Sequence, residues 1–125
     1  MIDKRIIIVG AGPAGISAAK KLVNHGIRPI IIDEANQSGG QVFRRQPKEF
    51  KRTPQKIYGF EAKSAIQEHF NYEKIADKIE ARFNTIVCGI ENQSLYLFNG
   101  VKVDVLEFDR LILATGAFDT VIPIP

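Results

Sequence analysis

The 125-residue sequence is short of the residues that build several common kinds of functional site. It has a single cysteine, Cys88, so it can form neither a disulfide within the chain nor the paired cysteines of a CxxC redox centre. No apolar stretch approaches the length of a membrane span, and the residues ahead of the first apolar run lack the pattern of a secretory signal. We therefore expect a cytoplasmic protein with no membrane span.

Residues that could act as a general base or bind a metal ion are also few. His25, His69 and Tyr58 have no partner residues in a pattern typical of acid–base catalysis. We expect His69 to be a surface or hydrogen-bonded histidine, and Cys88 to be a small buried apolar side chain. The sequence therefore predicts no catalytic residue and no metal ligand.

The chain is long enough for one domain, and its charge is unevenly distributed. Residues 1–60 carry 11 Lys and Arg against 4 Asp and Glu, whereas residues 61–125 carry 6 against 10. The basic excess lies between Arg44 and Lys56, and such a segment could contact nucleic acid. No aromatic platform accompanies it, so we expect no nucleic-acid partner. We interpret the segment as a solvated loop or as a surface facing an anionic cofactor or partner.

The glycines near the start of the chain carry the clearest functional signal. The apolar run Ile6-Ile7-Ile8-Val9 is followed directly by Gly10-Ala11-Gly12-Pro13-Ala14-Gly15. This spacing predicts a β-strand that turns into a helix around a dinucleotide pyrophosphate. Gly10 permits the tight turn, Gly12 lets the backbone approach the phosphates, and Gly15 lets the helix lie close to the sheet. The N-terminus of that helix presents free N–H groups to the anion.

A second buried strand completes a predicted β-α-β unit over residues 2–34. We expect the helix to run from Pro13 to His25, with Gly26 just past its end. The strand Pro29-Ile30-Ile31-Ile32 then ends at Asp33 and Glu34. An acid at this position typically binds the ribose hydroxyls of a dinucleotide, and Asp33 has the expected spacing. The alternative is a β-α-β unit without a ligand, whose acidic strand end is solvated.

The middle of the chain, residues 41–83, is predicted to be a loop with a helical insert. Residues 41–59 contain Pro47, Pro54 and Gly59 and show little periodicity, so they indicate a long loop with a short helix. Residues from Glu61 to Phe83 have the spacing of helices, with a break near Asn71.

The remainder of the chain is predicted to be β-structure. Residues 85–108 alternate with a period of two and indicate a three-stranded antiparallel β-meander, with a type I′ turn at Asn99-Gly100. A last buried strand, Leu111-Ile112-Leu113-Ala114, ends at Thr115-Gly116. The whole pattern is that of an α/β fold.

Three segments together resemble the N-terminal part of the FAD domain of glutathione-reductase-type flavoproteins, which bind two dinucleotides. They are Val9–Gly15 with Asp33, the run Gly39-Gly40-Gln41, and residues 109–117, which resemble the second FAD signature of that family. The resemblance implies a single, incomplete FAD-binding domain over residues 1–125. Its fold would be Rossmann-like, as in FAD/NAD(P)-binding domains, with a parallel sheet, helices and the meander.

The resemblance also implies FAD as the cofactor and suggests which residues contact it. The implied contacts are Gly10, Gly12, Pro13, Ala14 and Gly15 with the pyrophosphate, Asp33 or alternatively Glu34 with the adenosine ribose, Gly40 and Gln41 with the ribityl or flavin side, and Thr115 and Gly116, through their backbone, beside the pyrophosphate.

A narrower resemblance suggests the reaction. The segment from Gly39 to Pro47 is similar to the flavoprotein subunits of opine oxidase, hydrogen cyanide synthase and related amino-acid dehydrogenases. It implies an oxidoreductase that oxidises a C–N bond of a small amino-acid or opine-like substrate by hydride transfer to flavin. Disulfide reductases of the wider family need a redox cysteine pair, which this sequence lacks.

Complete members of the wider family also carry an NAD(P)-binding second domain and a C-terminal return to the FAD domain. The resemblance therefore implies a missing C-terminal segment or a partner subunit, with a homo-oligomer as another arrangement. Two alternatives stay open: an NAD(P)-binding Rossmann module, in which the acid after the second strand favours NAD, and a non-catalytic subunit or fragment completed by a partner chain.

Overall fold

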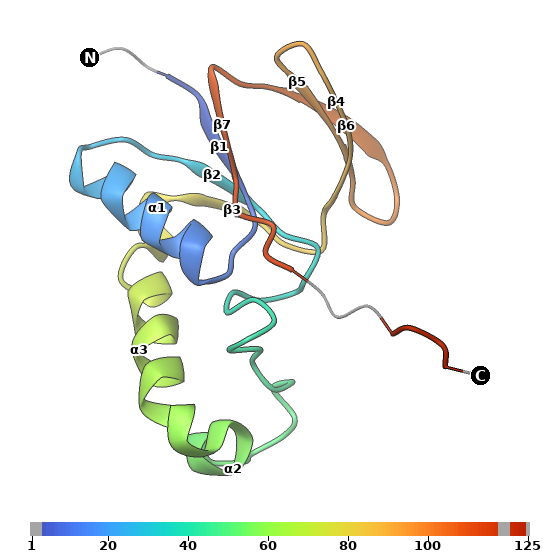
Figure 1. The fold of residues 1–125 in the computed structure, drawn as a ribbon. Helices are drawn as coiled ribbons and strands as arrows, with labels where there is room; N and C mark the ends of the chain where they lie inside the picture. The colour runs from blue at the N-terminus through green and yellow to red at the C-terminus, as the bar shows by residue number, and fades with distance from the viewer. Residues whose placement is uncertain (1–3, 118–120, 125) are drawn as a thin grey trace.

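The computed structural model describes residues 4–117 and 121–124, and it has three layers. Sheet A forms the middle layer, helices cover one of its faces, and the smaller sheet B covers the other (Figure 1). The predicted fold class, a parallel sheet with helices and an antiparallel meander, is confirmed. Residues 2–3 of the predicted β-α-β unit lie outside the described residues.

Sheet A consists of parallel strands that come from distant parts of the chain. Its order is β3-β2-β1-β7, so the first strand lies in the middle and the last strand forms one edge. The strands are β1 (Ile6–Val9), β2 (Ile30–Ile32), β3 (Glu80–Arg82) and β7 (Arg110–Leu113).

The central strands of sheet A are apolar along their whole length because both of their faces are buried. On β1, Ile8 packs towards the helices and Ile7 packs towards sheet B. On β2, Ile31 faces the helices, whereas Ile30 and Ile32 face sheet B. Sheet A therefore separates two hydrophobic cores, one beneath the helices and one beneath sheet B.

Helix α1 (Pro13–Asn24) begins at the predicted residue and ends one residue before the predicted His25, which is its C-cap. Pro13 stands in the first turn, where its missing N–H costs no hydrogen bond. Gly26 has a φ of +75° and donates its N–H to the carbonyl of Val23, as expected just past a helix end. Buried Gly15, Ile16 and Ala19 form the face of α1 that lies against sheet A.

The helical insert differs from its prediction at its C-terminal end. The helices are α2 (Pro54–Tyr58) and α3 (Ala62–Glu73), with short 3-10 turns η1 (Gly59–Glu61) and η2 (Ala76–Lys78). The predicted helix over 61–83 is wrong beyond η2, because Glu80–Arg82 forms the parallel strand β3. The sequence of this strand contains no apolar run from which it could be predicted. Backbone hydrogen bonds to β2 hold it at the edge of the sheet, including one of 3.0 Å from the Glu80 N–H to the Pro29 carbonyl.

Sheet B is the predicted meander, formed by β4 (Ile86–Glu91), β5 (Ser94–Phe98) and β6 (Val103–Glu107) in the order β4-β5-β6. Leu95 and Leu97 point into the core shared with sheet A. Cys88 falls where the register of β4 against β5 shifts, between Val87 and Gly89, and it is exposed, so its predicted burial is wrong. The face of sheet B that points away from sheet A is itself apolar, and its exposed residues include Ile86, Val103 and Val105.

The turn between β5 and β6 is also different from the predicted type I′. Phe98 pairs with Val103, so the connection has four residues instead of two. Gly100 has a positive φ of 89°, but Asn99 does not. Instead, the Asn99 side-chain oxygen accepts hydrogen bonds of 3.0 Å from the N–H groups of Val101 and Lys102. Among the residues that the structure describes, no helix is long and apolar enough to cross a membrane.

Candidate functional site

The residues predicted to contact a dinucleotide gather at the carboxyl ends of the parallel strands. This is the edge at which open α/β sheets bind their ligands. Two cavities open there, one of about 790 Å³ and one of about 260 Å³. Asp33, Glu34 and Thr115 border both cavities; Gly40, Gln41 and Gly116 line the larger one, and Gly10 lines the smaller one.

The three glycines of the first motif differ in whether the fold leaves room for a side chain at their position. Gly10 has a φ of +111°, and a Cβ atom there would lie 2.1 Å from the carbonyl oxygen of Ala114. A Cβ on Gly15 would lie 1.9 Å from the carbonyl oxygen of Gly10. The packing of the chain itself therefore requires both of these glycines, which close the strand–turn–helix joint.

Gly12 is different because the chain itself leaves room for a side chain there. Its φ of −78° and ψ of −175° are open to any residue. A Cβ on Gly12 would meet only the Cα of Gly40, at an ordinary contact distance of 3.5 Å. The absence of a side chain at Gly12 keeps the start of α1 open towards the space beside it, which fits the close approach of a ligand.

The N-terminus of α1 has the properties of an anion site. Gly12 is its N-cap and has no side-chain capping hydrogen bond, and the first turn contains no acidic residue. The Ile16 N–H bonds to the Gly12 carbonyl at 3.0 Å, whereas the N–H groups of Ala14 and Gly15 precede the first intrahelical bond. These donors and the positive end of the helix dipole suit a phosphate group.

The two acids after β2 are held differently. Asp33 is half-buried, and its carboxylate accepts hydrogen bonds from the N–H of Ala11 at 2.6 Å and from the N–H of Ala35 at 2.8 Å. Asp33 therefore braces the glycine turn. Glu34 is exposed at the border between the two cavities. A carboxylate offers about four acceptor positions, so Asp33 can still accept a hydroxyl while it holds the two N–H groups.

The segment Gly39-Gly40-Gln41 packs directly against the first glycine motif. Gly40 has a φ of +63°, and a Cβ on it would lie 2.9 Å from the Cα of Gly12. The Gly39 N–H donates to the carbonyl of Ala11 at 3.0 Å. The exposed residue Gln41 then lines the larger cavity. Two segments that are far apart in the sequence thus form one continuous backbone surface.

The end of β7 completes this surface from the other side. The Ala114 N–H bonds to the Val9 carbonyl at 2.8 Å, so residue 114 continues the pairing of β7 with β1. Thr115 and Gly116 follow at once and are exposed. They border the larger cavity opposite Gly40 and Gln41.

Several residues that line the cavities are not among the predicted contacts. Arg44 and Arg45 line the larger cavity, and Thr85, Ile86 and Val87 line the smaller one. The basic excess of residues 44–56 is the signal for the arginines, since one interpretation of it is a surface that faces an anionic cofactor. No local pattern points to Thr85–Val87, because they reach the site only through the packing of sheet B against sheet A.

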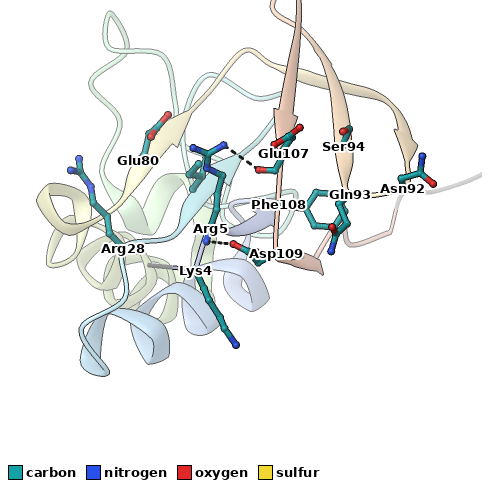
Figure 2. Close-up of a pocket in the computed structure, with 11 residues that line it drawn as sticks. Lys4, Arg5, Arg28, Glu80, Asn92, Gln93, Ser94, Glu107, Phe108 and Asp109 are labelled. Carbon is teal, nitrogen blue, oxygen red and sulfur yellow. Dashed lines mark hydrogen bonds between the residues drawn. The ribbon is translucent and has the colours of Figure 1, made fainter. Parts of the chain in front are cut away.

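A second large cavity, also of about 790 Å³, lies at the opposite end of sheet A (Figure 2). Figure 2 shows that both cationic and anionic side chains line it, and that Arg5 is hydrogen-bonded to Glu107 and Asp109. The lining contains Lys4, Arg5 and Arg28 together with Glu80, Glu107 and Asp109. Because its charges are balanced and no glycine turn or helix N-terminus faces it, this cavity lacks the features of the site described above.

The site therefore offers backbone donors, glycine surfaces and a carboxylate. Residues 4–117 and 121–124 contain no group of three or more His, Cys, Asp or Glu placed to hold a metal ion. His69 is bonded to a backbone carbonyl, as expected for a hydrogen-bonded histidine, and it does not border the larger cavity. Such an arrangement can bind and orient a dinucleotide, whose own ring system would supply redox chemistry.

Comparison with known proteins gives a consistent assignment. The family model described as pyridine nucleotide-disulphide oxidoreductase matches residues 4–125. Hydrogen cyanide synthase subunit HcnB from Pseudomonas protegens is 35% identical over 121 residues, which cover 95% of this chain and 26% of that protein. An opine oxidase subunit from Rhizobium meliloti is 50% identical over 38 residues, or 30% of this chain and 8% of that protein. The sequence-based resemblance to these subunits is confirmed.

Solved structures share the fold. The HOCl-induced flavoprotein disulfide reductase RclA from Escherichia coli, in its Cu(II) complex, aligns with a TM-score of 0.71 and 24% identity. The alignment covers all of this chain and 31% of that one. The chain spans about a quarter of the length of the HcnB relatives, at 26% and 27%.

Proposed function

We propose that this chain, which belongs to the pyridine nucleotide-disulphide oxidoreductase family, forms the FAD-binding cradle of a flavin-dependent oxidoreductase. The observation that supports this most strongly is the open side of Gly12. The chain requires Gly10 and Gly15 for its own packing, but it would accommodate a Cβ at Gly12. A glycine kept where the fold does not need one is best explained by a ligand whose phosphates approach the backbone.

The residues present fit the pyrophosphate and ribose of FAD. Gly10, Gly12 and Gly15 shape the turn, and the backbone from Pro13 to Gly15 would face the pyrophosphate. Asp33 would accept hydroxyls of the adenosine ribose, with Glu34 as the alternative. Gly40 and Gln41 would lie towards the ribityl and flavin side. Thr115 and Gly116 would border the pyrophosphate through their backbone groups, since they line the same cavity.

The finer part of the proposal concerns the reaction. The relatives are named as subunits of hydrogen cyanide synthase and opine oxidase, which favours oxidation of a C–N bond in a small amino-acid or opine-like substrate. Bound flavin would supply the hydride acceptor for such a step. The residues of this chain would bind and orient the cofactor, and we assign no proton transfer to any of them.

The remainder of the enzyme would come from a further segment or from a partner subunit. Two observations support this: the chain matches about a quarter of its HcnB relatives, and the outer face of sheet B exposes apolar side chains. Residues that contact the substrate would then lie largely on that other part. An NAD-binding module is the competing function, because the glycine motif and an acid after β2 also suit NAD.

Calorimetric titration of the chain with FAD, ADP and NAD tests the proposed cofactor. We expect FAD to bind more tightly than ADP, because the flavin-side segment adds contacts to those made by the ADP half. Equal and weak binding of FAD and ADP would restrict the site to its ADP half. Tighter binding of NAD, or no binding of any of the three, would contradict an FAD cradle.

Two glycine variants test the role of Gly12 separately from folding. Gly12→Ala should keep the chain folded, with at most about 1 kcal/mol lost at the N-cap, and should weaken ADP and FAD binding about tenfold or more. Gly89→Ala in sheet B is the matched control, because a Cβ there meets nothing closer than 3.9 Å. A Gly12→Ala chain that binds as well as the Gly89→Ala chain would remove the main support for the proposed site.

A further inference from the structure

The segment from Ser38 to Gln46 has two sides with different partners. One side lines the larger cavity, through Gly40, Gln41 and Arg44 among others. The other side rests on α2 and α3, which hold it through side chains that bond to its backbone. His69 contacts the Phe43 carbonyl oxygen through Nε2 at 2.8 Å, and Tyr58 donates its hydroxyl to the Arg44 carbonyl at 2.7 Å.

Arg45 provides a third set of contacts between the same segment and α3. Its guanidinium donates to the Ser38 hydroxyl and to the His69 carbonyl, each at 3.3 Å, and it forms an ion pair of 3.1 Å with Glu73. The Arg45 side chain is only 20% exposed, and its guanidinium lies 5.8 Å from the centre of the Tyr72 ring. The segment is therefore attached to α3 through Arg45, which also lines the larger cavity.

The Phe43 carbonyl links this attachment to the glycine motif. The Phe43 N–H bonds to the Gly39 carbonyl at 3.2 Å, which closes a turn around Gly39. A Cβ on Gly39 would lie only 2.2 Å from the Phe43 oxygen, so the carbonyl is packed against that residue. The Gly39 N–H in turn donates to Ala11 between the glycines of the first motif. A continuous series of contacts thus runs from α3 to the turn that begins α1.

The contact with the Phe43 carbonyl requires a proton on Nε2 of His69. A carbonyl oxygen can only accept, so Nε2 must carry the proton that it donates. The ring lies edge-on to Tyr58, with centroids 5.8 Å apart, and it borders a smaller cavity behind the segment. His69 is therefore not part of the lining of the larger cavity, and its Nε2 is hydrogen-bonded to the Phe43 carbonyl.

We propose that His69 is a positioning residue, which holds the Phe43 carbonyl and thereby keeps the flavin-side segment Gly39–Phe43 in register with the first glycine motif. This inference rests on the proposed FAD cradle and deepens it. It predicts that the His69 contact matters more for FAD than for ADP, because ADP lacks the part of the cofactor that the segment would face.

Substitutions of His69 provide the test in the full 125-residue chain. His69→Ala removes the donor, whereas His69→Gln keeps an amide N–H that can reach a nearby carbonyl. Lys63→Ala, at an exposed position of the same helix, is the control. By calorimetry we expect His69→Ala to weaken FAD binding about tenfold. ADP binding should change much less, and His69→Gln should restore most of the FAD affinity.

Amide hydrogen exchange in the ligand-free chain gives a second readout. In His69→Ala the Gly39 amide should exchange about tenfold faster. The Gly10 amide, which bonds to the Ile32 carbonyl, should keep its rate and so serves as the internal reference for folding.

The two ideas fail in different ways. If the unchanged chain binds neither FAD nor ADP, the proposed function is overturned. If the unchanged chain binds FAD but His69→Ala weakens FAD and ADP equally, or weakens neither, the positioning role is overturned alone. Unchanged exchange of the Gly39 amide in His69→Ala would also overturn it.

Discussion

Gly12 and Gly40 pack against each other through their backbones, and this contact requires a glycine at only one of the two positions. A Cβ on Gly40 would lie 2.9 Å from the Cα of Gly12, whereas a Cβ on Gly12 would remain 3.5 Å from the Cα of Gly40. Gly40 also has a φ of +63°, which side chains rarely adopt. Gly40 is therefore a packing residue, whereas the fold leaves room for a side chain at Gly12.

Gly40→Ala should destabilise the fold more than a glycine substitution made where there is open space. Gly59 has a similar φ of +57°, but a Cβ there would meet nothing within 4 Å. Gly59→Ala should therefore cost only the backbone strain, about 1–3 kcal/mol. Gly40→Ala should cost this amount plus the displacement of Gly12. Urea unfolding of both variants measures the difference, and equal losses would mean that the two loops do not need their close contact.

Asp33→Asn should affect both stability and ligand binding, whereas Glu34→Gln should affect at most binding. The Asp33 carboxylate accepts from two backbone N–H groups, and such charged hydrogen bonds contribute about 1.5–3 kcal/mol each. An amide has only one oxygen to offer, so Asp33→Asn should lower the unfolding free energy by about 1–3 kcal/mol.

The ribose contact can be assigned by comparing ADP with 2′-deoxy-ADP in the same two variants. The unchanged chain should prefer ADP, and the variant that removes the ribose acceptor should lose that preference. We expect Asp33→Asn to lose it. Loss of the preference in Glu34→Gln alone would transfer the ribose contact to Glu34, which borders both cavities.

Cys88 should react with a thiol reagent in the native state. It is exposed in β4, so a water-soluble disulfide reagent can reach it without unfolding of the chain. We expect one thiol to be modified in buffer at the same rate as in mild urea. Cys88→Ser should leave stability and cofactor binding unchanged. Protection of the thiol until the chain unfolds would indicate that another surface covers this part of β4 in solution.

Alkaline pH should destabilise the chain partly through two of its three tyrosines. Burial raises the pKa of the Tyr72 hydroxyl above its ordinary value of 10.0, and burial does the same to the pKa of Tyr58; the nearby Arg45 acts in the opposite direction. Because the raised pKa belongs to the folded state, the associated stability is fully present below pH 10 and is lost as the pH rises through the folded pKa. The free energy of unfolding of Tyr72→Phe, measured with urea, should fall less steeply over about pH 9–11 than that of the unchanged chain. Equal slopes would contradict a raised pKa of Tyr72 in the folded state.

The sequence predicts the part of the fold whose signals are local. In the β-α-β unit, particular residues mark the ends of the helix: Pro13 stands at its start and Gly26 just past its end. Each central strand is an apolar run. Strand β3 has no such signal, because Glu80–Arg82 is a polar edge strand that its neighbour holds through backbone bonds. Its place in the sheet depends on β2, which local pattern cannot show.

The error at Cys88 has a different cause. Cys88 lies where the register of β4 against β5 shifts, between Val87 and Gly89, so a strict period of two does not give the exposure of its side chain. The contacts of Arg45 and His69 with the segment Ser38–Gln46 are equally beyond local pattern. Their bonds to Ser38, Glu73 and Phe43 join loops and helices that meet only in the folded chain.

The pairing of β1 with β7 determines when, during synthesis, the first glycine motif can pack against the end of β7. Ile6 pairs with Arg110, and Gly10 packs on the backbone of Ala114, so the earliest motif depends on one of the latest strands. A nascent chain that has emerged only as far as sheet B already contains Gly10, Gly12 and Gly15 but lacks that closing strand. At about 5–20 residues per second, synthesis of the roughly 100 residues between β1 and β7 takes about 5–20 seconds. The β1–β7 pairing also raises the contact order of the domain, so we expect the cradle to form late in folding instead of nucleating it.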